Sequence, residues 1–472
     1  MTESAFFSTL AARQRTGQLW PDGKPGVVVM GAGSSGIAAL VELQRLQLPA
    51  LALESRAEIG GIWSQSPHPA TYPHLLQNTA PELTVFAEQR ANFVQSGSHL
   101  TRQQYANYLK HYTEHYQLTP QIYTGCTLLS IRQIQDGLEL VVQDSTHPDQ
   151  QMCIQASHLI NASGLYHQPQ WPQLPGLDSY TGTLWHSSEV DYQVLQQQQQ
   201  QVLVLGAGNT AVDMVVLAHR EGNQLSLSCR TPTWVLPRLV DSLPLDVLQQ
   251  QLSRHYGKTE GSTQFRRRCL EAGAWYSAGE PAVTELDFAK ARISVSTEVL
   301  PLLQQQVVTV YPGISHIAGR TVYFQDGRSM QPDCIICCTG YQYQSPELPA
   351  AAQTQQPLVA EVRHPTLAQY WCLGAPAVWG GSPPVAKAQA RLAATAIAAG
   401  WSVAELARRA QDGPVYQRTK QLVGPGFAVV EYQGYLDFVA ALCADSMSPG
   451  AALEGAACQV PPVNITRESY YV

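Results

Sequence analysis

The segment Val27-Val-Val-Met-Gly-Ala-Gly-Ser-Ser-Gly36 decides how the chain folds. Its four apolar residues predict a buried strand, and a Gly-x-Gly-x-x-Gly turn follows at once. Apolar residues at helical spacing continue to Leu43, and a second apolar run ends at Glu54. This order is typical of a dinucleotide-binding unit: a strand, a glycine turn, a helix and a second strand that ends in an acidic residue.

Each glycine of this turn has its own physical role. Gly31 permits a tight turn, Gly33 lets the backbone approach a pyrophosphate, and Gly36 lets the helix lie close to the strand. The free N–H groups at the start of the helix then face the phosphates. Glu54 lies where a carboxylate would accept hydrogen bonds from a ribose. A glycine-rich turn in some other α/β protein is the alternative, and the acid in register argues against it.

The same pattern occurs a second time. A strand over residues 202–205 leads into Gly206-Ala-Gly208-Asn-Thr-Ala211, and a helix and another strand follow. This copy ends in Arg230 and Thr231, where the first copy has Glu54. An acid would repel a ribose 2′-phosphate, whereas a guanidinium can bind one through two parallel hydrogen bonds. We therefore expect NADPH in the second unit, with Thr231 as a supporting donor.

The composition limits the classes of function. The chain has 472 residues, 44% of them hydrophobic and 14% charged, which predicts a globular protein of two or three domains. A net charge of −7 and a pI near 6.0 argue against nucleic acid or an anionic membrane as the main partner. Residues 1–18 lack the apolar stretch of a secretory signal, and no uncharged apolar run is long enough to cross a membrane. We expect a cytoplasmic protein.

The residues after Glu54 carry a family resemblance. Ile59-Gly60-Gly61-Ile62-Trp63 comes next, and Tyr72-Pro-His-Leu-Leu-Gln-Asn78-Thr79 follows. Together with the glycine turn, these segments resemble the flavin-containing monooxygenase family. The resemblance extends over about residues 26–400 and is weakest between residues 239 and 294. It implies FAD as the cofactor of the first unit.

The resemblance also implies roles for single residues. It places Asn78 beside the flavin ring and the nicotinamide, and Thr79 against the flavin. From the residues alone, a turn that ends at Pro81 is the better interpretation. The segment Tyr180-Thr-Gly182-Thr-Leu-Trp-His186 resembles another family fingerprint, but Val190 stands where an aromatic residue normally closes it. The subclass therefore stays open, and the histidine either orients cofactor or domain motion or is purely structural.

We expect an α/β fold with two Rossmann-like dinucleotide-binding domains and a C-terminal extension. The FAD-binding domain is discontinuous and comprises residues 20–175 and 330–440. The NADPH-binding domain comprises residues 176–329, and closely spaced prolines mark its beginning. An insertion at residues 239–294 is expected over the active site. Residues 441–472 form a tail that could lie against a partner subunit in a homodimer.

The expected contacts divide between the two cofactors. For FAD they are Gly31, Gly33, Ser34, Ser35, Gly36, Glu54, Arg56, Gly61, Ile62, Trp63, Asn78, Thr79 and Thr127. For NADPH they are Gly206, Gly208, Asn209, Thr210, Arg230 and Thr231. Arg238 is a weaker candidate for the 2′-phosphate. Asn78 is the one residue assigned a catalytic role, and no metal site is expected.

The family resemblance implies a reaction class. NADPH reduces FAD, dioxygen adds to the reduced flavin, and bound NADP⁺ protects the flavin hydroperoxide, which passes its distal oxygen to an amine nitrogen or a sulfide. Baeyer–Villiger oxygenation of a ketone is the nearest alternative. The sequence does not reveal the small-molecule substrate, and we expect its pocket to come from residues 239–294 and the loop near Trp379.

A different class of flavoprotein, the disulfide or quinone reductases, also uses two nucleotide folds. A disulfide reductase needs a redox cysteine pair beside the flavin. Most of the ten cysteines lie in apolar runs, and Cys334-Ile-Ile-Cys-Cys338 reads as a strand whose residues three apart point to opposite faces. This pattern favours buried free thiols. An NADPH oxidase or a flavin redox sensor stays open and would show negligible oxygen transfer.

Overall fold

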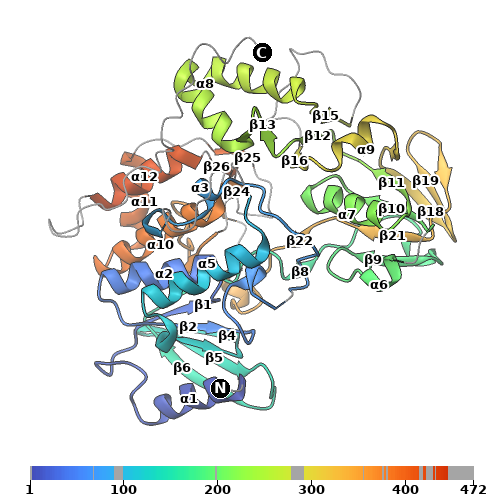
Figure 1. Cartoon of the computed structure of the whole chain (residues 1–472). Helices are drawn as coiled ribbons and strands as arrows, with labels where there is room; N and C mark the ends of the chain where they lie inside the picture. Colours follow the sequence, from blue (N-terminus) through green and yellow to red (C-terminus); the bar gives the residue numbers. More distant parts are fainter. Residues whose placement is uncertain are drawn as a thin grey trace.

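Two five-stranded parallel sheets dominate the computed structural model, one at the lower left and one at the right of Figure 1. The structure describes residues 3–66, 68–89, 99–196, 199–277, 292–353, 356–374, 377–378, 381–413, 418–420, 429–430 and 432–444. The loop near Trp379 and residues 445–472 of the expected tail lie outside the described residues.

The first parallel sheet carries the glycine turn at Gly31. Its central strand β1 pairs in parallel with β2 on one side and with β7 on the other. Both faces of the sheet are covered, which is why its strands are continuous apolar runs and do not alternate. The strand order is β23 (Tyr370–Cys372), β7 (His158–Asn161), β1 (Val27–Met30), β2 (Ala50–Glu54) and β3 (Ile122–Thr124).

The second parallel sheet repeats this order. Its central strand β10 pairs in parallel with β11 and β21 and leads into the second glycine turn. The strand order is β9 (Thr183–His186), β21 (Cys334–Cys337), β10 (Gln201–Leu205), β11 (Gln224–Ser228) and β17 (Val308–Tyr311). The edge strand β9 comes first in the chain, whereas its counterpart β23 comes last. The expected α/β fold with two Rossmann-like units is confirmed.

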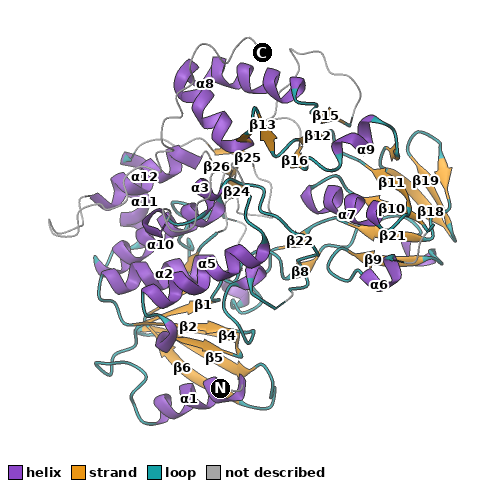
Figure 2. Ribbon diagram, viewed as in Figure 1, coloured by secondary structure: helices purple, strands orange, loops and turns teal. Residues whose placement is uncertain are grey.

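Each parallel sheet has helices on one face and a small antiparallel sheet on the other (Figure 2). The helices of the first unit are α2 (Ser34–Arg45), α5 (Arg102–His115) and α10 (Ser382–Ala398), and its antiparallel strands are β4 (Cys126–Ile134), β5 (Gly137–Asp144) and β6 (Gln151–Ala156). The second unit has α7 (Asn209–Arg220) and α9 (Leu300–Gln304), with β18 (Ile314–Ala318), β19 (Thr321–Phe324) and β20 (Ser329–Met330).

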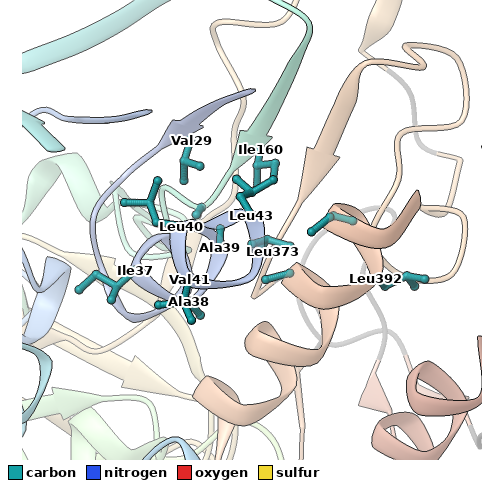
Figure 3. Close-up of a cluster of buried hydrophobic side chains, with 14 of the residues drawn as sticks. Val29, Ile37, Ala38, Ala39, Leu40, Val41, Leu43, Ile160, Leu373 and Leu392 are labelled. Atoms are coloured by element: carbon teal, nitrogen blue, oxygen red, sulfur yellow. The ribbon is translucent and has the colours of Figure 1, made fainter. Parts of the chain in front are cut away.

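Alternate residues of β1 belong to different cores. Val27 and Val29 pack on the helical face, whereas Val28 packs against the antiparallel strands. Figure 3 shows side chains of this helical core, with Val29 of β1, Ile160 of β7 and Leu40 of α2 close together and Leu392 on α10 farther to the right. Burying such a side chain stabilises the fold by about 1.5–3 kcal/mol. This packing gives the first glycine turn a rigid base.

Two connections join the units, and they pair with each other. The outgoing chain forms β8 (Gln168–Pro169), and the returning chain forms β22 (Tyr341–Gln342), which runs antiparallel to it. The N–H of Gln170 donates to the carbonyl oxygen of Gly340 at 2.9 Å. The proline-rich linker is therefore one strand of a ribbon between the two units.

The expected insertion forms a lobe at the top of Figure 1. It contains β13 (Leu239–Val240), β14 (Leu243–Pro244), α8 (Leu245–Glu271), β15 (Trp275–Tyr276) and most of β16 (Arg292–Val295), and β12 (Thr233–Leu236) comes just before it. The long helix α8 is interrupted at Gly257, whose φ of 78° and ψ of 168° are not helical. Residues 278–291 of this region lie outside the described residues.

The remaining elements complete the first unit and the loops. At the ends of the described chain, α1 packs beside β3 and α12 packs on α10. Their bounds, with those of the other short elements, are α1 (Glu3–Arg15), η1 (Gly61–Trp63), α3 (Pro81–Thr84), η2 (Ala87–Gln89), η3 (Thr119–Gln121), η4 (Leu177–Ser179), α6 (Tyr192–Leu195), η6 (Ala350–Ala352), β24 (Ala377–Val378), α11 (Val403–Asp412), β25 (Arg418–Lys420), β26 (Val429–Val430) and α12 (Tyr432–Ala444). Among the described residues, no helix has both the length and the apolar character to cross a membrane.

Candidate cofactor and active site

A cavity of about 1680 Å³ connects the carboxyl ends of the two parallel sheets. Ligands of open parallel sheets bind at this edge. Of the site residues expected from the sequence, Gly36 is absent from the cavity wall. The others all line it: Gly31, Gly33, Ser34, Ser35, Glu54, Arg56, Gly61, Ile62, Trp63, Asn78, Thr79, Thr127, Gly206, Gly208, Asn209, Thr210, Arg230 and Thr231.

Gly31 and Gly36 build the first turn in two different ways. Gly31 has a φ of 98°, and a Cβ added to it would lie 2.7 Å from the carbonyl oxygen of Ala162. A Cβ on Gly36 would lie only 1.9 Å from the carbonyl oxygen of Gly31. Because only glycine lacks that atom, α2 can pack this closely on the turn. Gly36 therefore shapes the turn by packing, outside the cavity wall.

Glu54 ends β2 and is 5% exposed. Its Oε2 accepts a hydrogen bond from the N–H of Ala32 at 2.8 Å, and its Oε1 accepts one from the N–H of Arg56 at 2.9 Å. The carboxylate thus ties the glycine turn to the segment after β2 while it lines the cavity. The hydroxyl of Ser55 also donates to Oε1, at 3.5 Å. A carboxylate can accept about four hydrogen bonds, so acceptor capacity remains for a ribose hydroxyl.

The Gly-Gly-x-Trp segment lies directly beside the first glycine turn. A Cβ on Gly33 would lie 3.6 Å from the Cα of Gly61, so the two backbones meet without intervening side chains. The ring of Trp63 packs edge-on against the buried ring of Tyr105, with centroids 5.5 Å apart. This contact fixes an apolar ring at the cavity wall.

Asn78 and Thr79 are half-buried and line the cavity ahead of α3. The hydroxyl of Thr79 shares a hydrogen bond of 2.7 Å with the hydroxyl of Thr84. The Oδ1 atom of Asn78 accepts a hydrogen bond of 3.4 Å from Nη2 of Arg238. The side chain of Asn78 is therefore held from the second unit, a contact that no sequence pattern indicated.

The second glycine turn leaves more open space than the first. A Cβ on Gly206 would lie 2.7 Å from the carbonyl oxygen of Cys338, whereas a Cβ on Gly208 would meet nothing within 4 Å. A pyrophosphate can therefore approach the backbone at Gly208, at the start of α7. The side chain of Asn209 has a different task, because its Oδ1 accepts a hydrogen bond from the N–H of Val295 at 2.8 Å.

Arg230 is exposed and lines the cavity together with Thr231. Within the described ranges, no carboxylate forms an ion pair with the Arg230 guanidinium. Arg292 lines the same cavity, and its N–H donates to the carbonyl oxygen of Pro232 at 3.1 Å. The sequence pattern did not indicate Arg292, because the pairing of β12 with β16 brings it beside this loop.

Arg238 is not available to a 2′-phosphate. Its guanidinium is 7% exposed and does not line the cavity. Its Nη1 donates to Glu298 Oε2 at 2.5 Å, and its Nη2 lies 3.5 Å from Asp213 Oδ1. Two carboxylates already neutralise this guanidinium, so the expectation that Arg238 could help to bind the 2′-phosphate is wrong.

His186 is fully buried where the two units join. Its Nε2 donates to the carbonyl oxygen of Gly340 at 2.9 Å, and its Nδ1 lies 2.8 Å from the hydroxyl of Ser188. Burial lowers the pKa of His186, which favours the neutral ring. The rings of Trp171 and Tyr341 pack against it. These contacts fit a structural histidine that joins β9 to the returning connection.

The described cysteines do not form a redox pair. All are free thiols, and Cys334 and Cys337 lie buried in β21. Burial raises the pKa of each of these two thiols to about 12, which makes them poor nucleophiles. Cys153 is exposed, and Cys229 and Cys338 are only half-buried, so the expectation of buried thiols does not hold at these three positions.

The insertion contributes to the cavity wall. Leu245 and Asp246 line the cavity at the start of α8. The Oδ2 atom of Asp246 accepts a hydrogen bond from the N–H of Ala80 at 2.9 Å, next to Thr79. Burial raises the pKa of Asp246 to about 6. The first turn of α8 is thereby fastened to the Asn78 segment.

Comparison with known proteins identifies the family. The chain matches the family described as flavin-binding monooxygenase-like over residues 24–399. It is 22% identical over 449 residues to the 4-hydroxybenzoate brominase (decarboxylating) of Marinomonas mediterranea, which covers 89% of this chain and 84% of that protein. It is 25% identical over 388 residues to a Baeyer–Villiger monooxygenase of Streptomyces coelicolor, and the alignment covers 75% of this chain and 70% of that protein. Human flavin-containing monooxygenase 1 is 24% identical over 346 residues, covering 68% and 63%.

Solved structures share the fold. The open crystal structure of cyclohexanone monooxygenase aligns with a TM-score of 0.63 at 15% identity, covering 91% of this chain and 98% of that one. A flavin-containing monooxygenase from Stenotrophomonas maltophilia aligns with a TM-score of 0.59 at 18% identity, covering 80% and 98%. The family match extends over most of the chain. The chain therefore belongs to the flavin-binding monooxygenase-like family, whose enzymes use FAD, NADPH and dioxygen.

Proposed function

We propose that this enzyme transfers one oxygen atom from dioxygen to an amine nitrogen or a sulfide sulfur of a small molecule. The observation that carries the proposal is the continuous cavity between two glycine turns whose units end in opposite charges, Glu54 in the first and Arg230 in the second. Baeyer–Villiger oxygenation of a ketone is the second candidate. The similarity to a Baeyer–Villiger monooxygenase and to the fold of cyclohexanone monooxygenase favours it.

FAD fits the first unit. Gly33 and Gly61 leave backbone exposed at the cavity wall, the start of α2 presents N–H groups, and Glu54 retains free acceptor capacity. FAD reduced by NADPH supplies the reaction with dioxygen. The chain's own residues hold the cofactor, and Ile62 and Trp63 add apolar surface that keeps water away.

NADPH fits the second unit. The open backbone at Gly208 suits the pyrophosphate, and the guanidinium groups of Arg230 and Arg292 suit the 2′-phosphate, with Thr231 as a supporting donor. Asn78 lines the same cavity as the two turns, and its amide can donate and accept hydrogen bonds. We assign Asn78 to holding the flavin ring and the nicotinamide in register.

The reaction balances without an acid–base dyad from the protein. NADPH and a solvent proton provide two electrons and two hydrogens. One oxygen atom of dioxygen enters the product, and the other leaves as water. A chain that binds and orients the reactants and excludes water is sufficient for this chemistry.

Isotopically labelled dioxygen tests the proposal. The enzyme is incubated with NADPH, labelled dioxygen and, in separate reactions, a tertiary amine, a thioether and a cyclic ketone. Mass spectrometry is expected to find one labelled oxygen atom in an N-oxide or a sulfoxide. A labelled lactone from the ketone alone would favour the second candidate. Hydrogen peroxide without any labelled product would contradict both and indicate an oxidase or a sensor.

A further inference from the structure

A buried polar junction connects Asn78 to the second unit. The guanidinium of Arg238 lies at its centre and is 7% exposed. Its Nη2 donates to Asn78 Oδ1 at 3.4 Å and lies 3.5 Å from Asp213 Oδ1, while its Nη1 donates to Glu298 Oε2 at 2.5 Å. Arg238 thus joins an amide oxygen of the first unit to two carboxylates of the second.

The backbone of Arg238 is fixed as well. Its N–H donates to the hydroxyl of Thr297 at 2.9 Å, and its carbonyl oxygen accepts a hydrogen bond from the N–H of Leu245 at 3.0 Å. Leu245 begins α8 and lines the cavity. The base of the Arg238 side chain is therefore fixed, and a guanidinium that moved away from Asn78 would also disturb its contacts with Glu298 and Asp213.

Asp213 extends this junction towards the second glycine turn. It lies in α7, one helical turn after Asn209, and its Oδ2 accepts a hydrogen bond from the hydroxyl of Tyr72 at 2.7 Å. Tyr72 belongs to the same segment as Asn78. Two side-chain contacts, Tyr72 with Asp213 and Asn78 with Arg238, therefore cross between the units within one short segment.

We propose that Arg238 is a positioning residue that fixes the orientation of the Asn78 amide. An amide side chain has two ends of nearly the same shape, but a guanidinium only donates hydrogen bonds and so selects the oxygen end. The NH₂ end of Asn78 is then left to donate into the cavity. This inference rests on the proposed role of Asn78 beside the cofactors.

A lysine at position 238 could not fix the Asn78 amide in the same way. Its ammonium group carries the same charge, but it lacks the planar fork that reaches an amide oxygen and two carboxylates together. Because Asp213 and Glu298 hold the fork, the Asn78 amide keeps its orientation while the two units remain docked. Oxygen transfer is thereby made to depend on the position of the second unit.

The number of product molecules formed per NADPH consumed tests the proposal, with hydrogen peroxide measured alongside. Arg238→Lys is expected to lower this ratio about tenfold, since misplacing a positioned group by about 1 Å can cost as much as 10²-fold. FAD content and NADP⁺ affinity should stay within about twofold, because Arg238 does not line the cavity and its side chain contacts only Asn78 among the expected cofactor residues. An unchanged ratio would overturn the proposal. Arg320→Lys, in the exposed pair with Asp333, is the matched control and should not change the ratio.

Two further variants separate positioning from a structural role. Glu298→Gln removes one of the two negative charges that hold the Arg238 guanidinium. Because the Glu298 side chain is 40% exposed, this variant should fold even if Arg238→Lys does not, and it should lower the ratio of product to NADPH. In an Asn78→Ala background, Arg238→Lys should lower the ratio no further, because its effect passes through that amide. An equal additional loss would show that Arg238 acts elsewhere. A wild-type enzyme that forms no oxygenated product at all would instead contradict the proposed function.

Discussion

The two glycine turns stand on sheets of the same strand order, yet the charged residues at their ribose ends are held differently. Glu54 is buried, and two backbone N–H groups donate to its carboxylate. Arg230 is exposed and has no carboxylate partner among the residues that the structure describes. The first charge is therefore held by the fold, whereas the second is free to serve the ligand role that we propose for it.

The third small residue of each turn shows the same contrast. A Cβ on Gly36 would lie 1.9 Å from a carbonyl oxygen, so the first turn accepts only glycine. Ala211 occupies the corresponding position of the second turn and is fully buried, so that turn accommodates a methyl group. The first turn is the tighter of the two, and its tolerance for change should be the lower.

The largest expected effect is that of a methyl group in the first turn. Gly36→Ala should destabilise the protein by about 3 kcal/mol or more, because the clash between the added methyl group and the carbonyl oxygen of Gly31 can be relieved only by moving the backbone. Ala211→Gly, the reverse change in the second turn, should cost about 1 kcal/mol, the usual helix cost of glycine. Denaturant unfolding and FAD content after purification measure both. Similar losses for the two variants would contradict the difference in tightness.

The next effect is expected at the end of β2. Glu54→Ala leaves the N–H groups of Ala32 and Arg56 without an acceptor, and each orphaned group costs about 1–3 kcal/mol. Its FAD content should fall with its stability. Arg230→Ala is the control and should leave the free energy of unfolding within about 0.5 kcal/mol, as surface changes usually do. If Arg230→Ala destabilised the protein as much as Glu54→Ala does, the proposed difference between a structural Glu54 and an unpaired Arg230 would be contradicted.

The smallest expected effect concerns Arg292, which lines the cavity beside the Arg230 loop. Arg292→Ala should weaken NADP⁺ binding about threefold, at the low end of what an exposed charge contributes. NAD⁺, which lacks the 2′-phosphate, should bind as it does to the wild type. Fluorescence titration of both nucleotides measures the difference. Equal weakening of the two would remove Arg292 from the phosphate site.

Local sequence was sufficient to predict both glycine turns and the charge at the end of each unit. These features depend on contiguous residues whose spacing is set by strand, turn and helix geometry. Asn78 required the family resemblance, because a turn was the better interpretation of its neighbours alone. Its contact with Arg238 joins residues 160 positions apart, and no local pattern encodes that.

Other parts of the site also depend on distant pairing. Arg292 reaches the cavity only because β16 pairs with β12. The side chain of Asn209 accepts a hydrogen bond from the backbone N–H of Val295, just after the expected insertion. Arg238 looked like a phosphate ligand because it is a cation near Arg230 in sequence, but Asp213 and Glu298 neutralise it in the fold. Charge alone does not distinguish a ligand group from a buried ion pair.

Calorimetric titration of NADP⁺ and NAD⁺ into the wild type and Arg230→Ala tests the central claim most directly. That claim is that the second turn reads a 2′-phosphate through an unpaired guanidinium. The affinity for NADP⁺ should fall about 10- to 100-fold, the value of one or two charge-assisted hydrogen bonds. The affinity for NAD⁺ should be unchanged. Equal losses for the two nucleotides, or none for either, would contradict the account.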